Sequence, residues 1–339
     1  MIKQRTLGRT DLKVSELCLG TLNFGWKTDE ATSFEIFDAF YAAGGNFIQG
    51  AAITPTFALP SASTAATEEV IGRWMASRRI PREKLVLGTR LSLHPSPGAG
   101  ANLAQLTAQS VRASMQRLNT DYLDLLMFEW NERMLPTSEV LEAFDLALRQ
   151  CFVRYVGASN FAAWRVADCI SLAFQRNQPR MEALQADYSL MTRARFEPEA
   201  MSLCAEQRLG FIATSPLAGG FLTTRKRTAE AAPLLRDRWA QRFRSIYGDV
   251  ALSAVAEVAA RHEASLAEVA LAWVLQNPTV TSALVGVRSG AEMQELARAS
   301  QLRLTPLDLR ELTAATETEE VRIDSDLLTR VGVEPVAAN

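Results

Sequence analysis

Short apolar segments rich in β-forming residues alternate with longer segments of helical periodicity, and this alternation constrains the fold more than any other feature of the chain. Repeated strand-then-helix units form a parallel sheet with the helices packed outside it. Eight units with no break in composition predict the closed (β/α)8 TIM barrel of the α/β class rather than an open doubly wound sheet. The expected strands are Glu16–Leu19, Asn46–Ile48, Leu85–Thr89, Tyr122–Phe128, Val153–Val156, Ala183–Ala186, Phe211–Ala213 and Ala283–Val285.

Segments between and before the strands fit this arrangement. Ile2–Val14 contains a Gly-Arg-Thr-Asp turn and predicts an N-terminal β-hairpin that plugs the bottom of the barrel. Ala51–Ala66 and Thr223–Gly248 predict two long loops after strands, and such loops lie on the catalytic face, so we expect both to shape a pocket. Helical periodicity is clear in Ala31–Ala43, Glu68–Ser77, Asn102–Leu118, Ser138–Arg149, Ala162–Ala173 and Leu266–Leu275.

Composition narrows the function classes. A chain of 339 residues that is 48% hydrophobic can bury a large core, and we expect one barrel domain over residues 1–339. A net charge of −2 with scattered Lys and Arg argues against a nucleic-acid partner. The N-terminus has no apolar signal region, and no apolar run approaches the roughly 20 residues of a membrane span, which predicts a cytoplasmic protein without a membrane partner.

Cysteine and histidine usage makes a metal site improbable. The four cysteines lie far apart, show no CxxC or CxxH spacing, and mostly fall in apolar segments, so we expect reduced structural thiols. The chain contains only two histidines, which excludes a cluster of several histidine ligands. We therefore expect no metal.

Several motifs identify a family resemblance. The segments are Leu7-Gly8-Arg9-Thr10 through Leu19-Gly20-Thr21, Val156-Gly157-Ala158-Ser159-Asn160-Phe161, Gln185-Ala186-Asp187-Tyr188-Ser189-Leu190, Thr214-Ser215-Pro216-Leu217 followed by Gly219-Gly220, Ala270-Leu271-Ala272-Trp273-Val274-Leu275, and Val285-Gly286-Val287-Arg288-Ser289. In this order and spacing they resemble the aldo-keto reductases over nearly the whole chain. The resemblance implies a TIM barrel that binds NADP or NAD across its mouth and acts on a small-molecule substrate, with a homo-oligomer possible.

The resemblance also implies which residues hold the cofactor. Ser159, Asn160 and Gln185 match the polar groups that fix the nicotinamide carboxamide, so that one face of the ring is presented for hydride transfer. Thr21 matches a cofactor contact at the end of the first strand, and Ser215 and Leu217 match donors to the pyrophosphate. The other positions expected to bind the cofactor are Gly286, Arg288 and Ser289.

Three departures weaken the cofactor site. Glu292 replaces the usual Gln or Arg of the adenosine end, where a carboxylate would repel a 2′-phosphate, so a preference for NADP is in doubt. Leu296 replaces an Asn that reads adenine, and Thr214 replaces the aromatic residue that stacks on the nicotinamide.

The reacting centre departs further from the family. The catalytic tetrad is Asp, Tyr, Lys and His, in which Tyr donates a proton to the carbonyl oxygen. Gln49 stands at the Asp position and Thr54 at the Tyr position, and no Asp, Glu, Lys, His or Tyr occurs from Asn46 to Thr67. A threonine hydroxyl has a pKa far above the roughly 10 of tyrosine and cannot replace it as an acid. Ordinary carbonyl reduction is therefore not expected.

Arg90 stands at the Lys position and Glu129 at the His position. They end adjacent strands, so we expect them to face each other as an ion pair that is either structural or catalytic. Two other groups on the same face could supply acid–base chemistry. His94 follows the third strand, and Tyr188 follows the sixth, where in this family a tyrosine tends to pack beside the cofactor.

Three functions remain open from the sequence. The first is a divergent NAD(P)-dependent oxidoreductase acting on a small organic metabolite by a non-standard mechanism. The second is a non-redox lyase, dehydratase, isomerase or cyclase that uses Glu129, Arg90 and His94 at the barrel mouth. The third is a catalytically silent binding or regulatory protein.

Overall fold

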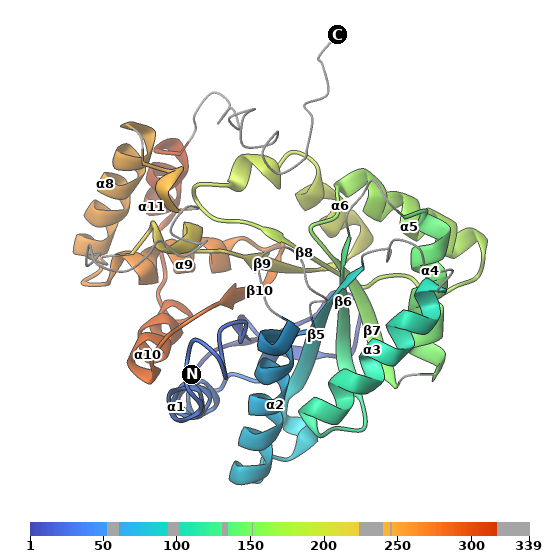
Figure 1. Cartoon of the computed structure of the whole chain (residues 1–339). Coiled ribbons are helices and arrows are strands. Elements are labelled where there is room, and N and C mark those ends of the chain that lie inside the picture. Colours follow the sequence, from blue (N-terminus) through green and yellow to red (C-terminus); the bar gives the residue numbers. More distant parts are fainter. Residues whose placement is uncertain are drawn as a thin grey trace.

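A computed structural model describes residues 1–52, 61–93, 102–130, 135–150, 152–223, 240–244 and 246–316. Eight parallel strands close into a barrel in the order β10-β3-β4-β5-β6-β7-β8-β9 (Figure 1). The strands are β3 Leu17–Gly20, β4 Phe47–Ala52, β5 Val86–Leu93, β6 Leu123–Trp130, β7 Val153–Ser159, β8 Ala183–Asp187, β9 Gly210–Thr214 and β10 Val280–Val285. The predicted TIM barrel is confirmed.

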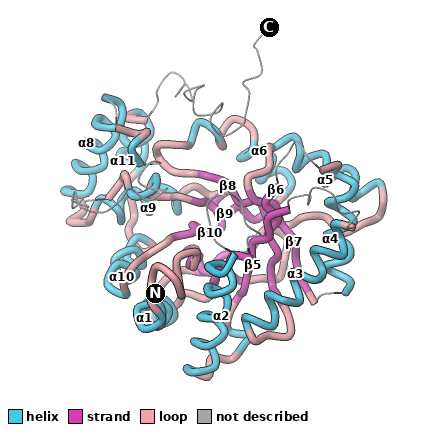
Figure 2. Tube along the Cα trace, in the orientation of Figure 1, coloured by secondary structure: helices cyan, strands magenta, loops and turns pink. Residues whose placement is uncertain are grey.

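Helices surround the strands on the outside (Figure 2). Several helices pack an apolar face against the strands, as α4 does through Val140, Leu141 and Phe144. The helices are α1 Glu30–Ala42, α2 Ser61–Arg78, α3 Leu103–Leu118, α4 Thr137–Gln150, α5 Ala163–Gln175, α6 Ala200–Gln207, α8 Ile246–Arg261, α9 Leu266–Gln276, α10 Gly290–Ala299 and α11 Pro306–Ala314, with short 3-10 turns η1 Arg82–Lys84, η2 Arg193–Arg195 and η3 Ala218–Gly220.

The N-terminal hairpin is also confirmed. β1 Gln4–Thr6 pairs antiparallel with β2 Lys13–Ser15. Leu7, Leu12 and Val14 are buried in one apolar cluster with inward residues of the barrel such as Phe47 and Ile212. The hairpin therefore closes the barrel interior at the amino ends of the strands.

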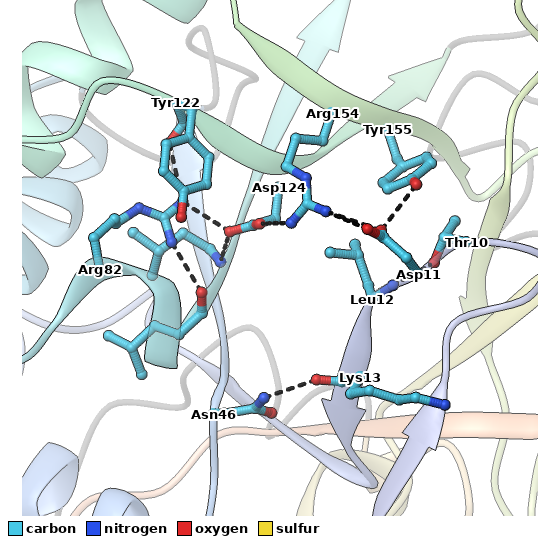
Figure 3. A network of polar contacts seen from close by, with 12 residues as sticks. Thr10, Asp11, Leu12, Lys13, Asn46, Arg82, Tyr122, Asp124, Arg154 and Tyr155 are labelled. Atoms are coloured by element: carbon cyan, nitrogen blue, oxygen red, sulfur yellow. Dashed lines mark hydrogen bonds and ion pairs between the residues drawn. The ribbon is translucent and has the colours of Figure 1, made fainter.

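A polar network fastens this plug to the barrel (Figure 3). Asp124 of β6 is buried and accepts hydrogen bonds from Arg82 and Arg154. The same Arg154 side chain continues to Asp11 of the hairpin, to which Tyr155 also donates. Four elements distant in sequence are thus linked at the bottom of the molecule, opposite the catalytic face.

Two expected loops are shorter in the structure. Ala51 and Ala52 extend β4, and α2 begins at Ser61, so only residues 53–60 of the first loop remain outside the described elements. Residues 246–248 of the second already belong to α8. The alanine-rich start of α2 favours helix, and pairing with β5 extends β4, which explains the first difference.

Three of the four cysteines lie in the described residues, and they are Cys18, Cys169 and Cys204. All three are buried and free, as expected for structural thiols. Within the described ranges no helix combines the length and apolarity that a membrane crossing requires.

Candidate functional site

Side chains from alternate strand positions converge at the carboxyl ends of the barrel strands. Residues two apart on a strand share a face, so Gln49 follows Phe47, Glu129 follows Met127 and Gln185 follows Ala183 on the inward side. Ser159 pairs in register with both Glu129 and Gln185. Gln49 and Glu129, at two of the expected tetrad positions, therefore lie together with Ser159 and Gln185, two of the expected carboxamide-binding residues, at the carboxyl ends of the strands.

Gln49 and Gln185 form a reciprocal amide pair across the barrel. Gln49 Nε2 donates to Gln185 Oε1 at 2.9 Å, and Gln185 Nε2 donates to Gln49 Oε1 at 3.0 Å. Both residues are buried, with relative exposures of 4% and 1%. β4 and β8 lie four places apart in a ring of eight, so the pair spans the barrel diameter. It forms a polar floor beneath the mouth.

Arg90, Glu129 and Asn160 form a second cluster on the neighbouring strands. The predicted ion pair is present, with Arg90 Nε 3.5 Å from Glu129 Oε2. Asn160 Nδ2 donates to Glu129 Oε1 at 3.1 Å. The Asn160 main chain is left-handed, and its N–H donates to the Gln185 carbonyl oxygen at 2.8 Å, which anchors the turn after β7. Glu129, at the expected His position of the tetrad, thus contacts Asn160, which is expected to hold the carboxamide, just as Gln49 contacts Gln185.

Ser159 is the one carboxamide-binding candidate without a side-chain partner. Its Oγ is buried and has no hydrogen bond to any described residue. A buried hydroxyl of this kind is costly unless a ligand or water supplies the partner. Thr21, in contrast, is committed, because its Oγ1 donates to the Gln49 carbonyl oxygen at 3.1 Å.

The loops expected to contact the pyrophosphate follow β9 and β10, which are paired neighbours. Ser215 adopts a left-handed conformation at the start of a tight turn, and Leu217 precedes η3. Gly286 faces open space, because no described atom lies within 4 Å of where a side chain would begin. These backbones can approach a phosphate group closely.

The first turn of α10 already carries negative charge. Ser289 caps the helix by accepting from the Glu292 N–H. Glu292 Oε2 accepts from the Arg288 N–H at 2.9 Å and lies 3.5 Å from Arg288 Nε. Glu35 Oε1 accepts from the Gly290 N–H at 3.2 Å. Two carboxylates therefore occupy the helix end that attracts anions.

Leu296 lies one turn further along α10 and is buried in the core at 2% exposure. A leucine in place of the expected Asn is explained by packing, because this position of α10 lies in the buried apolar core.

Tyr188 lies outside the mouth, which corrects its proposed catalytic role. Its ring is buried between Phe196, Phe211 and Trp273 in the layer between strands and helices. Its hydroxyl donates to Glu197 Oε1 at 3.0 Å and accepts from Asn277 Nδ2 at 2.8 Å. Burial raises the pKa of this hydroxyl further above 10. Residue 188 falls on the outward face because it is an odd step from Gln185.

Asp187 is a further acidic group at the mouth, one inward step beyond Gln185. Burial raises the pKa of its carboxyl, although Arg242, Ser215 and Arg195 oppose the shift. Arg242 Nη2 lies 3.6 Å from Asp187 Oδ2, and burial lowers the pKa of Arg242 to about 10. Strand alternation alone predicts that Asp187 faces inward like Gln185. No pattern in the sequence predicts its ion-pair partner, Arg242.

The remaining predicted catalytic residues, Thr54 and His94, lie outside the described residues. The His262 side chain is 21% exposed, and its Nε2 lies 2.8 Å from Asp308 Oδ2. It joins the segment after α8 to α11, far in sequence from any strand end.

Comparisons with known proteins agree with this architecture. The model of the Aldo/keto reductase family matches residues 16–317. An uncharacterized oxidoreductase of Bacillus subtilis, YrpG, is 34% identical over 319 residues, which cover 90% of this chain and 93% of the relative. Protein tas of Escherichia coli is 29% identical, with 90% and 95% covered, and versiconal hemiacetal acetate reductase of Aspergillus parasiticus is 27% identical, with 90% and 94% covered. The chain belongs to the aldo/keto reductase family.

Proposed function

We propose that this protein is an atypical nicotinamide-dependent oxidoreductase that acts on a small organic metabolite without a strong protein acid. The main support is the buried Ser159 Oγ, which has no partner among the described residues and lies in register with Gln185. A carboxamide offers both a donor and an acceptor, so it complements this unpartnered hydroxyl. When bound, the nicotinamide supplies a hydride.

The charge around α10 favours NAD over NADP as the cofactor. Glu35 and Glu292 already accept backbone N–H groups at this end of the helix. A 2′-phosphate would bring further negative charge next to them, which costs binding free energy. NAD lacks this phosphate and avoids the repulsion.

The side chains at the floor of the mouth cannot act as tyrosine does. The Gln49 amide is not an acid at neutral pH, and the Arg90 guanidinium holds its proton too tightly to release it. Glu129 faces Arg90 and accepts from Asn160, which are the contacts of a carboxylate and not of a proton donor. Loss of a general acid costs about 10²–10⁴ in rate for a ketone.

A substrate that is already cationic would not need that acid. In an iminium ion, hydride adds to carbon and the C=N π electrons become the nitrogen lone pair, so no proton enters the balance. The Glu129 side chain is 28% exposed at the mouth, so such a cation would compete with Arg90 for its carboxylate. We therefore propose electrophiles of this class over neutral ketones and aldehydes.

Two measurements test the proposal. NADH and NADPH are titrated against the pure protein with cofactor fluorescence as the readout, and we expect NADH to bind more tightly. NADH oxidation is then followed with matched cyclic iminium and ketone substrates, and we expect turnover only of the iminium ions. Failure of both cofactors to bind would refute the oxidoreductase. Binding without turnover of either class would favour a silent binding protein.

A further inference from the structure

We infer that Gln49 and Glu129 close the nicotinamide end of the site from within, so that the protein binds the ADP-ribose portion of a dinucleotide at least as tightly as the whole NADH molecule. The inference rests on the proposed function, because it assumes that an adenine dinucleotide lies across the mouth. The new element is that Gln49 and Glu129 form hydrogen bonds with Gln185 and Asn160, the residues expected to bind the carboxamide.

The amide pair imitates the ligand that Gln185 would otherwise bind. The Gln49 side chain presents one N–H donor and one carbonyl acceptor to Gln185, the same groups that a nicotinamide carboxamide carries. Both hydrogen bonds have near-ideal lengths of 2.9 and 3.0 Å and are buried. A carboxamide that displaced Gln49 would make no more hydrogen bonds to Gln185 than it broke, and it would leave the Gln49 amide unpaired.

The second replacement acts on Asn160 in the same way. Glu129 Oε1 accepts from Asn160 Nδ2 at 3.1 Å, and its other oxygen faces Arg90. A carboxylate is a stronger acceptor than a carboxamide oxygen, because charge-assisted hydrogen bonds are roughly twice as strong as neutral ones. Asn160 therefore also has an internal partner that competes with the nicotinamide.

At the other end of the site, internal partners among the described residues are found at the start of α10, where Glu35 and Glu292 accept from the Gly290 and Arg288 N–H groups, and at the Ser215 hydroxyl, which faces Asp187, but not at Gly286. Gly286 faces open space among the described residues, and the turn at Ser215 and Leu217 depends on its own backbone hydrogen bonds. The two ends of the dinucleotide should consequently contribute unequally to affinity. In an ordinary reductase the nicotinamide adds affinity, whereas here it should add none.

The test compares two ligands and two variants by isothermal titration calorimetry. ADP-ribose and NADH are titrated into the wild type, Gln49→Met and Gln276→Met. Methionine keeps the length of glutamine and removes its amide. Gln276 is the matched control, because it also makes two side-chain hydrogen bonds, to Leu304, at the end of α9. If Gln49→Met does not fold, Glu129→Gln replaces it, with a weaker hydrogen bond to Asn160 as the expected effect.

In the wild type we expect ADP-ribose to bind as tightly as NADH or more tightly. Gln49→Met should strengthen NADH binding about 10-fold, equivalent to about 1.4 kcal/mol, and leave ADP-ribose binding and the control unchanged. For Glu129→Gln we expect a gain of about threefold, also for NADH alone. Tighter wild-type binding of NADH than of ADP-ribose, with no change of that ratio in the variants, would overturn the inference while leaving the proposed function intact. Failure of the wild type and of every variant to bind either ligand would overturn the proposed function as well.

Discussion

Asp124 and Asp11 lie on either side of Arg154 in one ion-pair network and allow the effect of burial on stability to be measured (Figure 3). Both carboxylates bind Arg154, at 2.9 Å from Asp124 and 2.8 Å from Asp11. The Asp124 side chain is 1% exposed and that of Asp11 is 67% exposed. Replacing each with Asn changes the same chemical group in two different environments.

The expected losses differ severalfold. Asp124 accepts from Arg82 Nη2 at 2.7 Å, from the Leu87 N–H at 2.9 Å and from Arg154 Nη1 at 2.9 Å. Removing its charge leaves the partly buried Arg82 guanidinium without its carboxylate partner and takes one of two carboxylates from Arg154, and breaking a buried pair costs about 3–5 kcal/mol. Asp11 is a surface partner whose ion pair contributes about 0–1 kcal/mol.

Urea unfolding followed by circular dichroism gives the free energy of unfolding of the wild type, Asp124→Asn and Asp11→Asn. We expect Asp124→Asn to lose at least about 2 kcal/mol more than Asp11→Asn, with similar dependence on urea concentration. Equal losses, or an Asp124→Asn variant as stable as the wild type, would refute the argument that burial makes this carboxylate essential.

Three further predictions concern the cofactor, pH and thiols. Glu292→Gln should raise NADPH affinity about 5–10-fold and leave NADH unchanged in fluorescence titrations, since about 1 kcal/mol of repulsion is removed; equal gains for both would contradict it. Hydrogen bonds from His262, Thr305 and Arg261 outweigh desolvation and hold the pKa of Asp308 well below its ordinary 3.8. The depressed pKa stabilises the fold above about pH 4 and loses this effect as pH falls further, so the deficit of Asp308→Asn in urea unfolding should shrink below pH 4; a constant deficit would disprove this. Burial raises the pKa of Cys169 and Cys204 to about 12, so at pH 8 peptide mapping should find both alkylated only after unfolding, and rapid labelling of the native protein would be inconsistent with it.

Periodicity in the sequence was sufficient to predict the barrel. Each predicted strand overlaps an observed one, because burial between a helical layer and the barrel interior leaves a continuous apolar run of β-forming residues. The N-terminal hairpin was predictable from its Gly8 turn, and the Arg90–Glu129 pair from the adjacency of consecutive strands in a barrel. These features depend on local pattern or on neighbours in chain order.

Whether a side chain points into the barrel or outward could be predicted only by counting every second residue along its strand. Tyr188 is conspicuous in the sequence and was taken as a catalytic candidate, but an odd step from Gln185 places it among Phe196 and Trp273. Asp187, one position earlier, is the residue on the inward face. A shift of one residue decides which of the two reaches the mouth.

The sequence by itself determined the family and the barrel, because these follow from residue identity and from spacing along the chain. Only the tertiary structure decided what the replacements do. Gln49 and Gln185 are 136 residues apart and meet because barrel closure places β4 opposite β8. Contacts across a closed barrel have no periodic signature, since they depend on the ring of strands as a whole and not on any segment of it.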